Sequence, residues 1–181
     1  KGAWFTEERA KKYLFPRTPI AASIIGLSFR TSDADSIRDM DSFAEYSGKL
    51  VPISPQSAQY SIIQEYNEGH PEKPIKLVPS DTFIINDAYI WVLEGRYDGF
   101  LDIKLSFQNT VLNEDGANHQ FADKLSWIPY KGIPTWPLFA KEEQELAAAY
   151  DAAMGILKEN GRLAELSGQF FGEDVFQYVS E

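Results

Sequence analysis

Apolar and polar residues alternate along this chain in two distinct patterns, and together they predict helices interleaved with strands. Between residues 141 and 160 the apolar positions recur at helical spacing, and Gly161 marks the end of that helix. Residues 20–30 are instead rich in apolar and β-branched side chains and predict an extended segment. Shorter strands are expected at residues 49–53, 75–78, 97–101 and 125–128. This alternation is typical of an α/β fold with a mainly parallel sheet.

Capping residues and helix breakers place the remaining helices. Thr6 can cap a short helix, and Glu7 and Glu8 lie in its first turn, where the helix dipole favours negative charge. Residues 129–137 contain three prolines and one glycine, so an irregular segment is expected there. Further helices are expected at residues 42–47, from Ser57 to about residue 67, and at 80–94, 104–111 and 162–169.

The composition narrows the classes of function. With 181 residues, of which 44% are hydrophobic and 14% aromatic, the chain suits one or two compact domains. Its net charge of −10 argues against nucleic acid and against an anionic membrane surface as the main partner. The absence of cysteine excludes a disulfide framework, a thiolate nucleophile and a cysteine-type zinc site. The apolar run at 20–29 is shorter than the roughly 18 residues expected of a membrane span.

The two histidines, His70 and His119, lie in separate polar segments. A metal site or a Ser-His-acid triad needs side chains that converge, and nothing in the spacing brings these two together. We therefore expect two solvated loop histidines, with no metal ligand, no catalytic residue and no cofactor.

Four segments of the chain resemble motifs of one protein family. Residues 6–15 follow the pattern T-x-x-R-x-x-x-x-x-F, and residues 50–59 resemble a strand that leads into a G-T-T-Q helix start. Residues 93–99 contain a G-R-x-D segment, and residues 156–174 include a closing Phe-Gly pair. In this order and spacing they resemble the polar amino-acid-binding family of extracytoplasmic solute-binding proteins, which hand a solute to an ABC importer.

The resemblance implies a two-lobed periplasmic-binding-protein-like fold of type II, in which crossing strands join lobes that close around a ligand by hinge rotation. Lobe one would comprise residues 1–22 and 135–181, and lobe two residues 23–134. In the family, further strands and helices precede the T-x-x-R motif, so lobe one is expected to be partial and lobe two complete. The implied function is to bind an amino acid or related small carboxylate between the lobes and to deliver it to a membrane permease, outside the cytoplasm and without catalysis.

Two other classes of function stay open. The same fold serves as the ligand-binding sensory domain of receptors and kinases, which a transmembrane segment in the gene product would indicate. Some dehydratases also resemble this fold, and such an enzyme would need a general acid or base of shifted pKa in its cleft. The sequence offers no convincing acid–base pair, so solute binding is the favoured interpretation.

In lobe one the resemblance assigns ligand contacts to Arg9, Thr6 and Trp4. A guanidinium matches a carboxylate with two parallel hydrogen bonds and stays charged, so Arg9 would hold the ligand's α-carboxylate. The alternative is a surface arginine paired with an acid, although Glu7 and Glu8 are too near in sequence to share its helix face. Thr6 would touch the same carboxylate or only cap the helix. The Trp4 backbone would face the ligand amine, or its side chain would be core.

In lobe two the resemblance assigns ligand contacts to Gln56, Ser57 and Ala58 at the start of a helix. Free N–H groups and the helix dipole favour an anionic group there, although Ser57 is also an ordinary capping residue. Gln56 stands where the family usually has glycine, so its side chain would narrow the pocket or add a polar contact.

Asp102 is the expected contact for a ligand amine, but its position departs from the family pattern. The family's amine-binding aspartate usually lies five residues after the position of Asp98, which in this chain is Ile103. Asp102 comes one residue early, and alternation along a strand would turn it to the opposite face unless a bulge re-aims it. Lys104 follows and would repel an ammonium. Either Asp102 or a group of lobe one would therefore hold the amine.

Overall fold

The chain folds into two compact units. The computed structural model describes residues 2–80, 82 and 85–179. Unit 1 comprises Lys1–Ile24 and Lys131–Glu181, and unit 2 comprises Ile25–Tyr130. Strands β1 (Ala21–Arg30) and β3 (Leu125–Thr135) each contain one of these boundaries, so the chain passes between the units twice. Assignment of unit 1 and unit 2 to lobes one and two stays a proposal.

The three named strands form one sheet in the order β2-β1-β3, where β2 is Phe100–Ile103. β1 pairs with β2 antiparallel, from Ile25 opposite Ile103 to Ser28 opposite Phe100. The antiparallel β1–β2 pair therefore departs from the expected mainly parallel sheet. Parallel pairing occurs in unit 2 only as isolated bridges among the described residues: Lys49 with Lys76, Leu50 with Gly99, and Ile53 with Pro79.

A proline explains why the expected strands at 49–53 and 75–78 stop at single bridges. Pro52 has no N–H to donate, so a continuous ladder cannot form through it, whereas Pro79 is tolerated as the partner of Ile53 because Val78 and Ser80 make the hydrogen bonds there. Prolines also lie within β3, where an irregular segment was expected, yet the strand continues to Thr135. That prediction was wrong because β3 is an edge strand of the sheet, where a missing N–H costs little.

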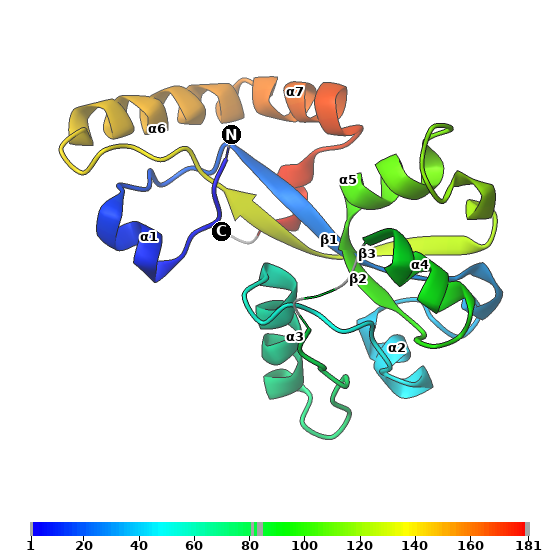
Figure 1. Cartoon of the computed structure of the whole chain (residues 1–181). Coiled ribbons are helices and arrows are strands. Elements are labelled where there is room, and N and C mark those ends of the chain that lie inside the picture. The colour runs from blue at the N-terminus through cyan, green and yellow to red at the C-terminus, as the bar shows by residue number, and fades with distance from the viewer. Residues whose placement is uncertain (1, 81, 83–84, 180–181) are drawn as a thin grey trace. The chain divides into compact units, whose positions relative to one another are not determined.

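The helices of unit 2 lie around its strands (Figure 1), and one buried apolar cluster includes Val51, Tyr89 and Phe100. β1 is buried along nearly its whole length, as expected of a strand covered on both faces. A side chain at Gly99 would place its Cβ 2.6 Å from Leu27 Cδ1, so any larger residue there would displace the buried Leu27 side chain. The helices of unit 2 are α2 (Met40–Tyr46), α3 (Ala58–Gly69), α4 (Ile85–Leu93), α5 (Lys104–Phe107), a π-helical turn (Gln108–Leu112) and two 3₁₀ turns (Thr31–Asp33 and His119–Phe121). The start expected for α4, at Ser80, borders residues outside the described part of the chain.

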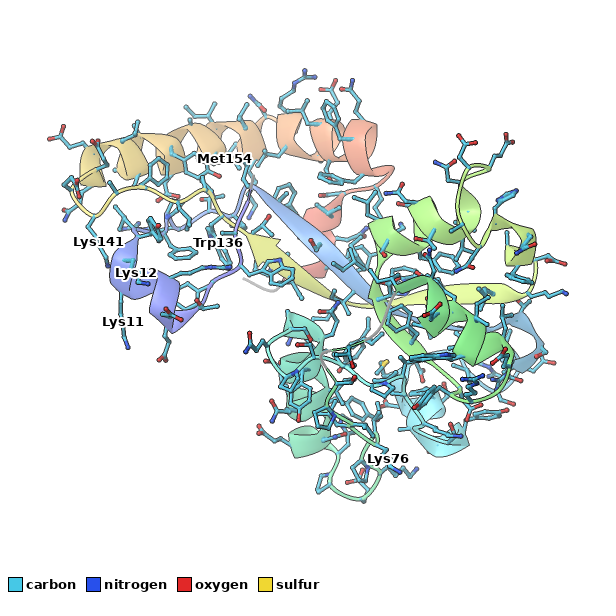
Figure 2. All side chains as sticks on the ribbon, in the orientation of Figure 1. Lys11, Lys12, Lys76, Trp136, Lys141 and Met154 are labelled. Carbon is cyan, nitrogen blue, oxygen red and sulfur yellow. The ribbon has the colours of Figure 1, made fainter. Side chains whose placement is uncertain are left out.

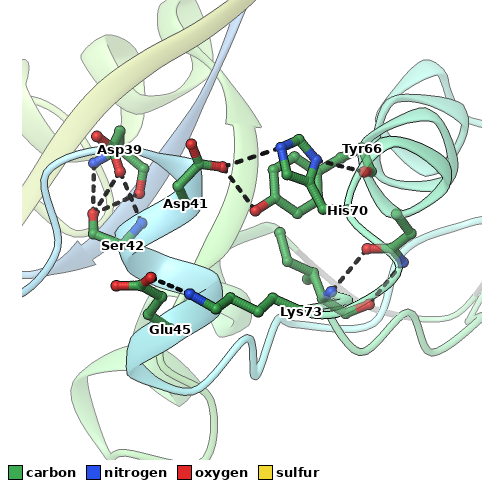
Figure 3. A network of polar contacts seen from close by, with 9 residues as sticks. Asp39, Asp41, Ser42, Glu45, Tyr66, His70 and Lys73 are labelled. Atoms are coloured by element: carbon green, nitrogen blue, oxygen red, sulfur yellow. Dashed lines mark hydrogen bonds and ion pairs between the residues drawn. The ribbon is translucent and has the colours of Figure 1, made fainter.

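A polar network ties α2 to α3 (Figure 3). The Tyr66 hydroxyl donates to Asp41 at 2.9 Å, and the His70 ring stacks on Tyr66 with centroids 4.2 Å apart. Lys73 adds an ion pair with Glu45. His70 follows the C-terminus of α3 and stacks on Tyr66, and its side chain keeps 41% exposure. His119 lies elsewhere, in a 3₁₀ turn, and no group of three metal-ligating side chains occurs among the described residues.

Unit 1 consists of α1 (Glu7–Lys12), α6 (Gln144–Glu159), α7 (Arg162–Phe171) and a 3₁₀ turn (Val175–Tyr178). Two short backbone pairings hold its N-terminal segment, one between Ala3 and Trp136 and one between Leu14 and Phe139. The Asp151 carboxylate of α6 accepts from the N–H groups of Arg17 (3.0 Å) and Thr18 (2.8 Å). Figure 1 shows α6 and α7 following one another as the two long helices of this unit.

Candidate functional site

Arg9 is presented by a short, well-capped helix of unit 1. The Thr6 hydroxyl accepts from the Arg9 backbone N–H at 3.2 Å, so Thr6 is the N-cap of α1. The guanidinium folds back, and its Nη1 donates to the Trp4 carbonyl oxygen at 2.9 Å. Trp4, Thr6 and Arg9, three of the expected ligand residues, are thus brought together by hydrogen bonds.

The Arg9 guanidinium is exposed, and within the described part of the chain no carboxylate pairs with it. Glu8 lies one residue away but pairs with Lys12 at 3.4 Å, along another face of the helix. One nitrogen is fixed by the Trp4 carbonyl, and the remaining N–H groups are available. Such a group can bind a carboxylate in bidentate fashion with little further loss of rotamer freedom.

An aromatic cluster lies in the same unit and was not singled out from the sequence. The Phe5 ring contacts Phe15 with centroids 5.1 Å apart, and Trp136 contacts both at 6.4 and 6.0 Å, all edge-on. Phe5 is 54% exposed although it is a large apolar side chain. The signal in the sequence was an aromatic residue on each side of the T-x-x-R segment, but the third ring comes from a distant position.

The start of α3 in unit 2 places Gln56, Ser57 and Ala58 in one turn. The Ser57 hydroxyl accepts from the Tyr60 N–H at 3.2 Å and donates to the Ser54 carbonyl at 2.8 Å, so it is fully engaged as a cap. Ala58 is the first helical residue, and the N–H groups of this first turn have no acceptor inside the helix. What this turn can offer to a ligand is therefore backbone N–H groups and the exposed Gln56 side chain.

Asp102 lies in the core of unit 2 and does not face solvent. Its residue is 3% exposed, and one carboxylate oxygen accepts from the Tyr89 hydroxyl while the other accepts from the Ile103 N–H at 2.7 Å. The pairing of β2 with β1 is regular through Asp102, so no bulge re-aims it. The structure therefore argues against Asp102 as a contact for a ligand amine.

Burial also sets the protonation of Asp102. Desolvation raises the pKa of this carboxyl to about 6, although the hydrogen bond from Tyr89 and that from the Ile103 N–H favour the ionised form. Burial, together with the neighbouring Asp102, raises the pKa of the Tyr89 phenol well above its ordinary value. The pair is a structural element of the core of unit 2.

No helix in the described part of the chain is long and apolar enough to cross a membrane.

Known proteins were compared at the level of sequence and of structure. No family model and no curated protein sequence matches this chain. Solved structures do match: the probable amino-acid ABC transporter extracellular-binding protein ytmK of Bacillus subtilis has 21% identity and a TM-score of 0.67, over 95% of this chain and 69% of that one. A structure from work on glutathione import through GshT and the cystine ABC importer TcyBC of Streptococcus mutans has 23% identity and a TM-score of 0.61, over 98% and 69%.

The L-cystine solute receptor of Neisseria gonorrhoeae, in its unliganded open conformation, is also similar, with 20% identity and a TM-score of 0.57 over 97% of this chain and 65% of that one. These structural similarities confirm the predicted fold class. This chain aligns with only 65–69% of each matched chain, which agrees with a fold that is partly present. The chain thus has the two-lobed α/β fold of these solved structures, and it spans about two thirds of their length.

Proposed function

We propose that this chain binds a small amino-acid-like solute through the solute's carboxylate and delivers it to the membrane permease of an ABC importer. The observation that carries the proposal is Arg9: an exposed guanidinium, fixed at one nitrogen by the Trp4 carbonyl and paired with no acid among the described residues. The matching solved structures are named as receptors of amino acids or cystine, which supports the same class of ligand.

The chemistry at Arg9 favours a carboxylate over other anions of similar size. The guanidinium is planar and presents paired N–H donors, and a carboxylate offers two oxygens at matching separation. Thr6 caps the same turn, so its hydroxyl and Arg9 are held within one short segment. Phe5 lies beside them in sequence and supplies an apolar surface for the rest of the solute.

The start of α3 gives unit 2 a second group of donors. Its free N–H groups and the positive end of the helix dipole favour a polar or anionic atom of a ligand. Gln56 adds an exposed amide at the same turn. The ligand amine has no assigned partner in this proposal, because Asp102 is engaged in the core.

A binding role is favoured over a catalytic one. The described carboxyl whose pKa is raised towards neutrality is Asp102, and it is buried against Tyr89. A general acid or base must reach the substrate within hydrogen-bond distance. This group therefore lacks the access that a dehydratase-like reaction would need. The matching receptors further suggest an extracytoplasmic location.

The test is a calorimetric screen of amino acids and small carboxylates on the 181-residue chain, with Arg9→Ala as the variant. If Arg9 pairs with the ligand carboxylate, the variant should lose on the order of 2–5 kcal/mol of binding free energy. Lys11→Gln is the matched control, since it removes a cation from the same helix and should leave affinity unchanged. Unchanged affinity in Arg9→Ala would contradict the assignment.

A further inference from the structure

Unit 2 contains a hollow of about 430 Å³ that is lined by cations and aromatic rings. Three of the lining residues are basic and two are aromatic, namely Lys49, Lys76, Arg96, Trp91 and Tyr97. No acidic residue is among the described residues that line it, although the whole chain carries a net charge of −10. The volume is that of a small-molecule site.

The two lysines are brought together by backbone pairing. Lys49 and Lys76 are partners in a parallel bridge, and the Lys76 N–H donates to the Gly48 carbonyl at 3.0 Å. Directly paired residues project to the same side of a sheet, and like charges in that position destabilise the pair. Within the described ranges neither ammonium makes an ion pair, while Lys49 Nζ lies 5.8 Å from the centre of the Tyr97 ring. Figure 2 shows Lys76 at the outer surface of unit 2.

The aromatic wall is built by the turn that ends α4. Gly95 has a φ of +72°, which turns the chain so that the Arg96 N–H donates back to the Trp91 carbonyl at 2.9 Å. The Tyr97 ring then lies against Trp91, with centroids 6.1 Å apart. The wall is therefore fixed before any ligand arrives.

Arg30 holds the same turn from behind. Its Nη1 donates to the carbonyls of Val92 (2.7 Å) and Tyr97 (3.0 Å), and its guanidinium pairs with Asp98. Asp98 follows Tyr97 in the chain, and its carboxylate is thus engaged with Arg30. Arg96 is partly neutralised by Glu94 at 2.8 Å, so most of the uncompensated charge at the hollow comes from the two lysines.

We propose that this hollow binds a small anion with a flat apolar body, such as an aromatic carboxylate. The lysines would take the charge, and the Trp91 and Tyr97 rings would cover the body. A small anion responds to charges within about one Debye length, roughly 8–10 Å, and so to the local cations. A polyanion or an anionic membrane would also meet the negative charge of the whole chain.

This hollow is distinct from the α3 turn of the proposed solute site. Lys49 and Lys76 lie at the beginning of the parallel-bridged segments, whereas Ile53, paired with Pro79, lies at the end that leads to Ser57. Lys49 and Ile53 are four residue steps apart, which in an extended chain corresponds to about 13 Å. Arg9 belongs to unit 1, so loss of the solute site through Arg9 would leave this hollow intact.

The experiment follows the indole N–H signals of the 181-residue chain, which has four tryptophans, by ¹H–¹⁵N NMR. Trp91→Phe assigns the Trp91 signal. We expect indole-3-acetate and benzoate to shift that signal saturably. The uncharged indole-3-acetamide should bind at least about tenfold more weakly, because it lacks the charge that the lysine ammonium groups pair with. Added salt should weaken binding of the carboxylates.

Variants separate the hollow from general surface charge. Lys49→Gln with Lys76→Gln should weaken carboxylate binding at least about tenfold, and Lys76→Gln alone should weaken it less. Lys11→Gln with Lys12→Gln is the matched control on α1 and should change nothing, as should Arg9→Ala (Figure 2). Thermal melts of each variant show that it is folded.

Three results would overturn the proposal. The first is no shift of the Trp91 signal with any carboxylate, and the second is equal binding of the acetamide. The third is binding of phosphatidylglycerol vesicles that depends on the two lysines while the small carboxylates do not bind, which would make this surface one for a polyanion. Loss of solute binding in Arg9→Ala with an unchanged Trp91 titration keeps the two sites separate.

Discussion

The two units bury apolar side chains to very different degrees. All of the largest fully buried side chains lie in unit 2, and among them are Tyr89, Phe29 and Phe43. Apart from Pro16, the buried apolar residues of unit 1, among those described, are Ala22, Ile24, Ala147, Met154 and Val175. Unit 2 therefore has a core of its own, as an independent domain requires.

Unit 1 has long helices but little core. Leu146 and Ile156 of α6 and Phe170 of α7 are 54%, 62% and 72% exposed. An apolar side chain that stays in water adds nothing to the hydrophobic stabilisation of the fold. A unit with long helices therefore need not have a large buried core. The stability of unit 1 must come mainly from backbone pairing, the Asp151 contacts and the aromatic cluster.

The largest predicted effect compares the same substitution in the two units. Ile63 on α3 is fully buried, so Ile63→Ala should lower the free energy of unfolding by about 2–5 kcal/mol. Ile156 on α6 is 62% exposed, so Ile156→Ala should change it by no more than about 0.5 kcal/mol. Urea denaturation of both variants measures the difference. Equal losses would show that α6 is covered in solution.

Hydrogen exchange should show the same contrast residue by residue. Amides of unit 2 between residues 49 and 101 should be strongly protected, because they open only when the core is lost. Amides around Arg9 and Leu146 should exchange faster, since few buried apolar side chains hold those helices. Uniform protection of both units in a monomer would contradict the contrast and indicate one cooperative fold.

Local signals in the sequence predicted many elements correctly. Thr6 caps α1 and Ser57 caps α3, as the side-chain chemistry of caps predicts. The apolar run of β1 and the helical spacing of α6 each gave an element within a few residues of its observed bounds. These signals suffice because capping and periodicity depend on neighbours in the chain.

Features that depend on distant segments could not be predicted. The length of β3 through Pro129 and Pro134 follows from its place at the sheet edge, which the sequence does not show. Asp102 is core because its strand pairs with β1 and its carboxylate meets Tyr89 from α4. Alternation along the strand predicted that Asp102 points to the opposite face from Ile103, but it could not predict that Tyr89 would be its partner there.

Burial in unit 2 also predicts a pH dependence of stability. The pKa of Asp102 is raised from 3.8 to about 6, so between these values the folded state keeps a proton that the unfolded state has lost. The free energy of unfolding should therefore fall as pH rises from about 4 to 6, by at most about 3 kcal/mol.

Asp102→Asn tests whether Asp102 causes this pH dependence, because it removes the titrating carboxyl. In urea unfolding measured from pH 4 to 7, the decrease in the free energy of unfolding with rising pH should become much smaller in this variant. Tyr89→Phe removes a hydrogen bond that favours the ionised carboxylate, so it should extend the fall to higher pH. A fall of the same size in Asp102→Asn would assign the pH dependence to another group.

The smallest predicted effect lies at the surface of unit 2. Lys76 faces Lys49 across a parallel bridge, so Lys76→Gln relieves repulsion and should raise the free energy of unfolding by a few tenths of a kcal/mol. Lys11→Gln in unit 1 has no such partner and should leave stability unchanged. Added salt screens the repulsion, so the gain in Lys76→Gln should shrink as ionic strength rises. An aromatic carboxylate should offset this gain, since it binds and stabilises the wild type more than the variant. If Lys76→Gln were instead destabilising without ligand, the two lysines would not repel, and the charge argument for the hollow would be wrong.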